Sequence, residues 1–154
     1  FVESISLYQI MLQAFFIGLI FAIFVITNLI HFPYFTLMKA NIVKVIAEAM
    51  LEKKGQEVVS LNFKKIPTAI ADHFVICHAD SSTNVSAIAD NVEDQVIVNC
   101  KRKVLRQQGR ENNLWIILDY GDVMVHVFQT QYRSFYKLEE LWADAKRTDY
   151  KEED

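Results

Sequence analysis

The sequence is poor in cysteine, glycine and proline: its 154 residues hold two cysteines, four glycines and two prolines. Two cysteines are too few for a disulfide framework, and Cys77 and Cys100 stand in no spacing typical of a metal site. We therefore interpret both as reduced thiols in apolar surroundings. The glycines are isolated from one another, so the chain has no Gly-rich loop that could hold a phosphate.

Charged side chains are missing from the first part of the chain. No Asp, Glu, Lys or Arg occurs in residues 4–37, whereas residues 38–154 have an ordinary mixture of both signs. We expect the apolar segment 1–37 to be non-native sequence upstream of a start at Met38, because charge begins at that methionine. The alternative is a membrane anchor, since a stretch of this length can span a bilayer and the lysines behind it would keep the rest on the cytoplasmic side.

The charged part is expected to form one domain, residues 38–145, followed by a charged, flexible tail, residues 146–154. The net charge of −3 argues against a protein that wraps DNA or other bare nucleic acid, and is compatible with docking onto a basic protein surface. A basic run spans Lys101 to Arg110. It is either a minor contact with RNA or a solvated helix end, and we favour the second because no aromatic residue interleaves it.

Hydrophobic periodicity predicts helices and strands in a mixed order. Apolar residues recur with the helical period in residues 42–50 and again from residue 85 to about residue 103, where Asp80–Ser82 supplies an N-cap. Short runs rich in β-formers predict strands at 57–63, 73–79, 114–119 and 123–128. This order indicates an α/β fold in which helices flank a small mixed β-sheet.

Residues 114–142 read as strand, tight turn, strand and helix. Gly121 and Asp122 form the two-residue turn, because glycine accepts a positive φ and aspartate tolerates it. The final helix is predicted to present one apolar stripe, made of Phe135, Leu138 and Trp142.

Residue types that could carry chemistry occur without the spacing that chemistry needs. His73 and Cys77 share one face of a strand while His78 points to the other, so the three cannot converge on a metal ion. The paired carboxylates of a nucleotide-transferring enzyme are missing as well. We therefore predict neither catalysis nor a bound cofactor or metal. His126, in mid-strand, is either a partly buried histidine bonded to a neighbour or a contact residue on an exposed sheet face.

Two aspartates and three aromatic residues complete the candidates. Asp119 and Asp122 bracket the turn, and we expect their carboxylates to accept hydrogen bonds from nearby backbone amides, with shaping of a docking surface as the alternative. Trp115 at a strand edge and Tyr136 in the following helix are predicted to be partly exposed, and these residue types are enriched in interface hot spots. Trp142 is expected to belong to the core.

A spaced set of residues in the second half of the chain matches a family pattern: Trp115, Asp119, Gly121, Asp122, Val125, His126, Val127, Tyr136, Leu138, Glu139, Leu141 and Trp142. On these residues the chain resembles the ribosomal silencing factor family, also called RsfS or Iojap. A second match covers Asp72, Val75, Ile76, Ser81, Ser82, Ala87, Ile88, Ala89 and Asp90. The chain departs from the family at Ala79-Asp80 and at Gln108-Gly109, where the pattern often has Gly and Glu-Gly.

The resemblance implies a mixed sheet flanked by helices, distantly like that of nucleotidyltransferases, without their activity. It implies a cytoplasmic, ribosome-associated protein that docks on the large ribosomal subunit through universal large-subunit protein fourteen, with at most a minor contact to ribosomal RNA. There it would block joining of the small subunit and lower translation when nutrients are scarce. The other class left open is a membrane-anchored cytoplasmic interaction domain. The contact positions carried over by resemblance are Trp115, Ile117 and Tyr136, and we add Asp119 and Glu139 as charged residues at the rim.

Overall fold

The computed structural model describes residues 40–152. The predictions for the apolar segment 1–37 and for a start at Met38 lie outside these residues. Within residues 40–152 no helix is both long enough and apolar enough to cross a membrane.

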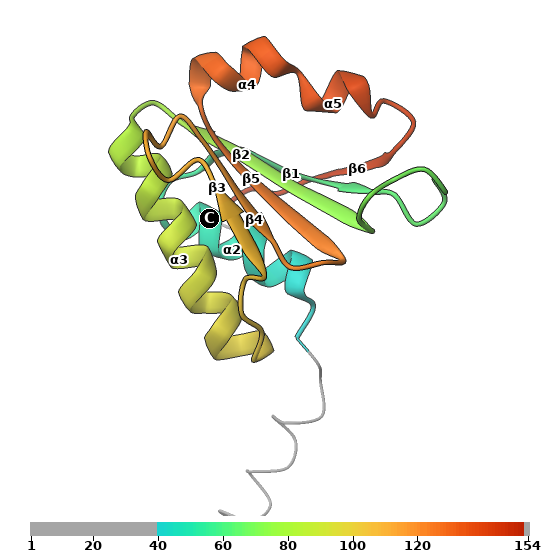
Figure 1. The fold of residues 1–154 in the computed structure, drawn as a ribbon, viewed down its shortest axis with the longest axis horizontal. Coiled ribbons are helices and arrows are strands. Elements are labelled where there is room, and N and C mark those ends of the chain that lie inside the picture. The colour runs from blue at the N-terminus through green and yellow to red at the C-terminus, as the bar shows by residue number, and fades with distance from the viewer. Residues whose placement is uncertain (1–39, 153–154) are drawn as a thin grey trace, which may run out of the picture. The chain divides into compact units, whose positions relative to one another are not determined.

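Six strands form one twisted sheet in the order β3-β4-β5-β2-β1-β6 (Figure 1). All neighbours pair antiparallel except β2 and β5, which run parallel at the centre. The sheet is therefore mixed, and the predicted α/β fold with flanking helices is confirmed. The strand bounds are β1 Gln56–Asn62, β2 His73–Ala79, β3 Arg106–Gln108, β4 Trp115–Asp119, β5 Val123–Gln129 and β6 Lys146–Asp149.

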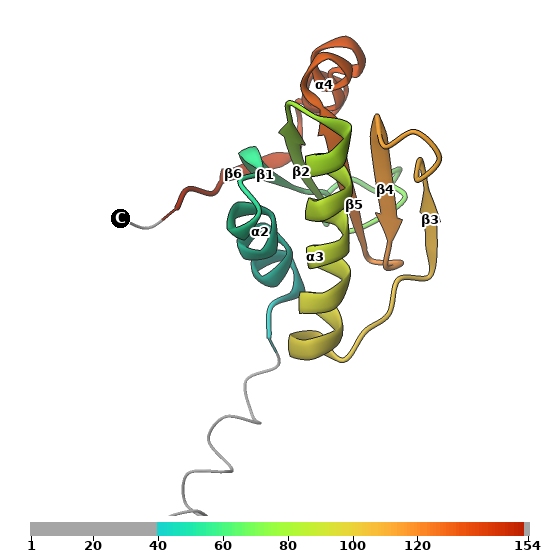
Figure 2. The ribbon, with the colours of Figure 1, turned by 90° about the vertical axis from the view of Figure 1, so that its left-hand side faces the viewer.

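Two longer helices, α2 (Ile42–Glu52) and α3 (Ser82–Cys100), cover one face of the sheet (Figure 2). Each begins at a side-chain cap: Asn41 Oδ1 accepts a hydrogen bond from the Val43 amide at 3.1 Å, and Ser81 Oγ from the Asn84 amide at 3.2 Å. These bonds satisfy amides that the first turn of a helix leaves without a partner. The predicted N-cap before α3 is thus confirmed.

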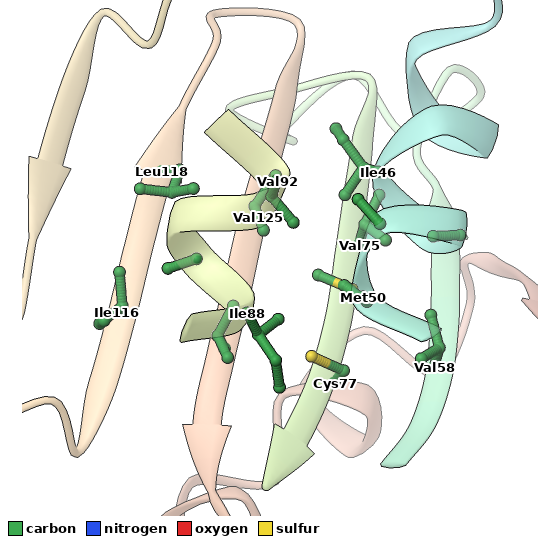
Figure 3. Close-up of a cluster of buried hydrophobic side chains, with 14 of the residues drawn as sticks. Ile46, Met50, Val58, Val75, Cys77, Ile88, Val92, Ile116, Leu118 and Val125 are labelled. Carbon is green, nitrogen blue, oxygen red and sulfur yellow. The ribbon is translucent and has the colours of Figure 1, made fainter. Parts of the chain in front are cut away.

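The main hydrophobic core lies between these helices and the sheet. Ile46 and Met50 from α2 and Ile88 from α3 are fully buried against Val75 and Val125 of the central strands (Figure 3). Burial of each such side chain contributes about 1.5–3 kcal/mol. The strand predicted at residues 123–128 is confirmed as β5, and its alternate residues Val123, Val125 and Val127 all belong to this core.

The opposite face of the sheet carries a second cluster rich in aromatic residues. Phe63, Phe74 and Phe128 are buried there, and Trp142 packs edge-on to Phe63 with ring centroids 5.0 Å apart. Two short helices, α4 (Thr130–Tyr136) and α5 (Leu138–Leu141), follow β5 on this side. Leu138 and Trp142 pack against the cluster, so the assignment of Trp142 to the core side is confirmed.

The single helix expected after β5 is wrong in two respects. Lys137 has φ 49° and ends α4, so that α5 starts as a separate helix at Leu138. The predicted stripe is thereby divided: Leu138 is half-buried, whereas Phe135 is 77 % exposed. A left-handed residue turns the chain, and the 3.6-residue period cannot continue through it.

The flexible tail expected at residues 146–154 is also wrong in its first part. Residues 146–149 form β6, which pairs antiparallel with β1. Tyr150 extends this contact, since its amide donates to the Val58 carbonyl at 2.9 Å and its hydroxyl lies 3.1 Å from Ser60 Oγ. Four polar residues carry no strand pattern, and their order comes from backbone bonds to the edge of β1.

Between α3 and β4 the structure differs from the sequence prediction in two smaller ways. Helix α3 ends at Cys100 rather than near Lys103, because Lys101 takes a left-handed conformation with φ 55°. The polar residues that follow form β3 along the edge of β4.

Candidate docking surface

Strand β4 places Trp115 and Ile117 on the same face of the sheet, two residues apart. Their partners across the ladder on β5 are Phe128 and His126. Both Trp115 and Ile117 are half-buried, in contrast to Ile116 and Leu118, which are completely buried in the main core. The partial exposure predicted for Trp115 is therefore confirmed, and Ile117 shares its face.

The indole of Trp115 contacts two aromatic rings. It stacks on Phe128 with ring centroids 4.7 Å apart and an interplanar angle of 21°. On α4, Tyr136 lies at the same centroid distance from the indole, tilted by 41°. Trp115 and Tyr136 were both predicted to be partly exposed, and the fold brings them into contact.

Apolar surface continues from Tyr136 onto the neighbouring residue. Tyr136 is 44 % exposed, and the ring of Phe135 meets it edge-on at 5.2 Å. We call Trp115, Ile117, Phe135 and Tyr136 the docking surface. Large exposed aromatic side chains in contact with one another are typical of a surface that binds another protein. Sequence reasoning placed Phe135 on one apolar stripe with Leu138 and Trp142 and so missed it as a member.

His126 lies beneath this surface and is 4 % exposed. Its Nδ1 accepts a hydrogen bond from Trp115 Nε1 at 3.3 Å. Burial lowers the pKa of His126 to about 3, so the imidazole is neutral and carries its proton on Nε2. Of the two interpretations of His126, the structure supports a histidine bonded to its neighbour, and the ring is fully buried rather than partly.

The two aspartates of the turn have different roles. Asp119 Oδ1 accepts a hydrogen bond from the Gly121 amide at 2.7 Å, and Gly121 has φ +92°, as the predicted hairpin requires. Asp122 instead forms a salt bridge with Arg102, and this hydrogen-bonded guanidinium lowers the pKa of the carboxyl. The expected bond from Asp122 to a nearby amide is thus replaced by an ion pair. Asp119 lies at the end of β4 on the same face as Trp115 and Ile117, so its place at the rim of the docking surface stays a prediction.

Glu139 was expected at the rim as a charge for a partner, and the structure corrects this. Its carboxylate accepts hydrogen bonds from Arg133 Nε at 2.9 Å and Nη2 at 2.5 Å. Arg133, whose side chain is 8 % exposed, also donates to the Glu57 carbonyl at 2.8 Å and contacts His78 Nδ1 at 2.9 Å. Glu139 is therefore engaged inside the molecule. No sequence pattern marked Arg133, because an arginine in a helix is normally a surface residue.

The remaining candidate residues are buried or paired inside the molecule. Cys77 is completely buried, which raises the pKa of its thiol to about 12 and leaves it unreactive. In the basic run, Arg102 pairs with Asp122, and Arg110 pairs with Asp90 and Glu93 at 2.6 and 2.9 Å. Among residues 40–152, no three His, Cys, Asp or Glu side chains are grouped as a metal site would need.

A family model described as "Ribosomal silencing factor during starvation" matches residues 37–154. The chain belongs to the ribosomal silencing factor family. The ribosomal silencing factor RsfS of Bacillus subtilis is 38 % identical over 109 residues, which cover 71 % of this chain and 91 % of that protein. RsfS of Halalkalibacterium halodurans is 40 % identical over 105 residues, covering 68 % and 88 %. The chloroplastic protein Iojap of Zea mays is 36 % identical over 72 residues, covering 47 % and 31 %.

Solved structures agree with the family assignment. A crystal structure from Bacillus halodurans superposes with a TM-score of 0.57 at 37 % identity, covering 65 % of this chain and 91 % of that one. A second, from Chromobacterium violaceum, gives a TM-score of 0.62 at 28 % identity and covers 72 % and 91 %. The α/β fold of this silencing factor is thus shared with experimentally determined structures.

Proposed function

We propose that this silencing factor binds the large ribosomal subunit at its inter-subunit face and blocks joining of the small subunit by occupying that face. In cells short of nutrients this would lower translation. The partner contacted through the docking surface is universal large-subunit protein fourteen. The mechanism is binding rather than catalysis. Relatives named ribosomal silencing factor RsfS support a role at the ribosome.

The observation that carries this proposal is the contact between Trp115 and Tyr136 at the surface. The Trp115 indole stacks on the buried Phe128 and its centroid lies 4.7 Å from that of Tyr136, so the surface is pre-formed and little side-chain freedom is lost on binding. Tyrosine and tryptophan combine a large apolar area with a polar tip, and such residues commonly dominate the energy of an interface.

The net charge of the chain also suits this partner. A protein with net charge −3 is attracted to the basic surface of a ribosomal protein and is repelled by exposed RNA phosphates. With Arg102 and Arg110 engaged in ion pairs, the basic run offers fewer cations to RNA than its sequence suggests. The proposed contact is therefore mainly with protein.

Co-sedimentation with purified bacterial large subunits tests the proposal. Tyr136→Ala should weaken binding by about 2 kcal/mol, close to thirtyfold, because it removes an exposed hot-spot ring. A matched control is Val98→Ala, which trims a side chain that is 60 % exposed on α3, on the opposite face of the sheet. In a subunit-joining assay the wild-type protein should reduce formation of whole ribosomes. Normal binding by folded Tyr136→Ala and Trp115→Ala proteins would reject this surface.

A further inference from the structure

His126 is a polar residue in a place that packing alone would fill with an apolar one. Its ring lies on the aromatic side of the sheet, 4.7 Å from Phe74 between centroids, and is almost completely buried. The Nε2 atom has no hydrogen-bond partner among the described residues. Packing against the Phe74 ring recovers only part of the free energy that is lost when a polar group leaves water. Burial of the imidazole therefore lowers the stability of the fold locally, and packing does not explain why a histidine occupies this position.

What the imidazole provides is an acceptor for the indole N–H of Trp115. Trp115 is directly opposite Phe128 in the ladder, so His126 is its diagonal neighbour on β5. Aromatic side chains reach one another across such a diagonal. The bond from Nε1 to Nδ1, at 3.3 Å, fixes which edge of the indole faces inward. With an apolar residue at this position the N–H would have to stay unpaired or turn outward to water.

We infer that His126 is a positioning residue of the docking surface: it holds the indole of Trp115 in the orientation that supports Tyr136 and faces the ribosome. This inference rests on the proposed function, because it assigns His126 a part in binding the large subunit. Stacking on Phe128 sets the plane of the indole, the bond to His126 sets its rotation within that plane, and Tyr136 packs against the indole so placed.

Two substitutions in the full chain separate this role from packing. His126→Leu removes the acceptor, whereas His126→Gln keeps an acceptor oxygen on a side chain of similar reach. We expect His126→Leu to melt at or above the wild-type temperature, since a buried unpaired group is removed, and to bind large subunits five- to tenfold more weakly. His126→Gln should recover most of the affinity. Met124→Leu, a conservative change of a half-buried residue on the same face of β5, is the matched control and should bind as wild type.

A spectroscopic readout reports on the bond itself. The indole N–H of Trp115 should give a hydrogen-bonded NMR resonance that exchanges slowly with water, and in His126→Leu it should exchange faster while that of Trp142 is unchanged. Trp115→Phe, which removes the indole N–H, completes a double-mutant cycle. In the Trp115→Phe background, His126→Leu should cost no further affinity, because the bond it breaks is already gone.

The outcomes are distinct. Wild-type binding by a folded His126→Leu protein, or equal losses with and without the Trp115 indole, would overturn this inference and leave the proposed function intact. If His126→Leu and His126→Gln both fail to fold, His126 serves packing and the inference is wrong. If the wild-type protein itself does not co-sediment with large subunits, the proposed function fails and the role of His126 in docking fails with it.

Discussion

Arg133 and Glu139 form a salt bridge across the break between α4 and α5, with Nε 2.9 Å from the carboxylate oxygen. The two side chains are 8 % and 18 % exposed, so water screens the pair little. Because Arg133 also donates to the Glu57 carbonyl on β1, one buried guanidinium ties both short helices to the sheet. Tyr136 of the docking surface lies between the two partners in sequence, and its position depends on this connection.

Removing one partner of this pair should be strongly destabilising. Glu139→Gln leaves a buried guanidinium without its counter-charge, and we expect the free energy of unfolding to fall by about 3 kcal/mol. Urea denaturation followed by circular dichroism measures the change. The control is Glu140→Gln, whose side chain is 70 % exposed and pairs with Lys137 at the surface, where a loss below about 0.5 kcal/mol is expected. Equal stability of the two variants would contradict the structural role of Arg133.

The core face of α3 gives a second prediction. Ile88 is completely buried, so Ile88→Asp places an unpaired carboxylate in the core and should cost several kcal/mol, on the order of the whole stability of the domain. Val98→Asp makes the same kind of change on the same helix at a side chain that is 60 % exposed. That variant should fold with nearly wild-type stability. A cooperative wild-type melt from Ile88→Asp would show that this helix face is wrongly assigned.

Acid should destabilise the protein through His126. Burial lowers the pKa of His126 from 6.5 to about 3. Between these two pH values His126 is therefore neutral in the folded protein and protonated in the unfolded chain. This contribution to the free energy of unfolding is complete above pH 6.5 and is lost as the pH falls toward 3. The loss is about 2 kcal/mol at pH 5. Urea denaturation at pH 7 and pH 5 measures it. His73 and His78, whose pKa values burial also lowers, add to the loss in every variant. His126→Leu should therefore lose about 2 kcal/mol less than wild type between the two pH values, and an equal loss would contradict the assigned pKa of His126.

The C-terminal strand should be required for full stability. Deleting residues 146–154 removes β6 and exposes the edge of β1, and we expect a loss of about 3 kcal/mol from the backbone hydrogen bonds. Deleting residues 151–154 alone keeps β6 and Tyr150 and should change the melting temperature little. Size-exclusion chromatography provides a second measurement, because an uncovered strand edge promotes association. If both truncations melt alike, the pairing of β6 with β1 contributes nothing.

Sequence and structure agree best where a local period decides the outcome. The apolar stripe containing Val85, Ile88 and Val92 placed α3 correctly on the core, and the run of β-formers around Val125 placed β5. These patterns act within one or two turns of the chain, so each can be interpreted without knowing its neighbours. The family resemblance was also carried by the spacing of residues along the chain, most of them in its second half.

Local sequence patterns did not predict all residues of the docking surface. The resemblance named Trp115, Ile117 and Tyr136 as contact positions. The sequence placed Phe135 on a stripe with Leu138 and Trp142, and Glu139 at the rim. The left-handed turn at Lys137 reversed both assignments. Lysine does not favour that conformation, so no local propensity predicted it.

By itself, the sequence determined the fold class, the two long helices, the central strands and the family, because hydrophobic periodicity and spaced motifs are properties of the chain. Only the tertiary structure decided that β6 pairs with β1, that Arg133 holds Glu139 inside the molecule, and that His126 bonds to Trp115. Each of these joins residues whose attraction depends on burial, on distance or on an open strand edge. Those quantities exist only once the chain has folded, and no pattern of neighbouring residues encodes them.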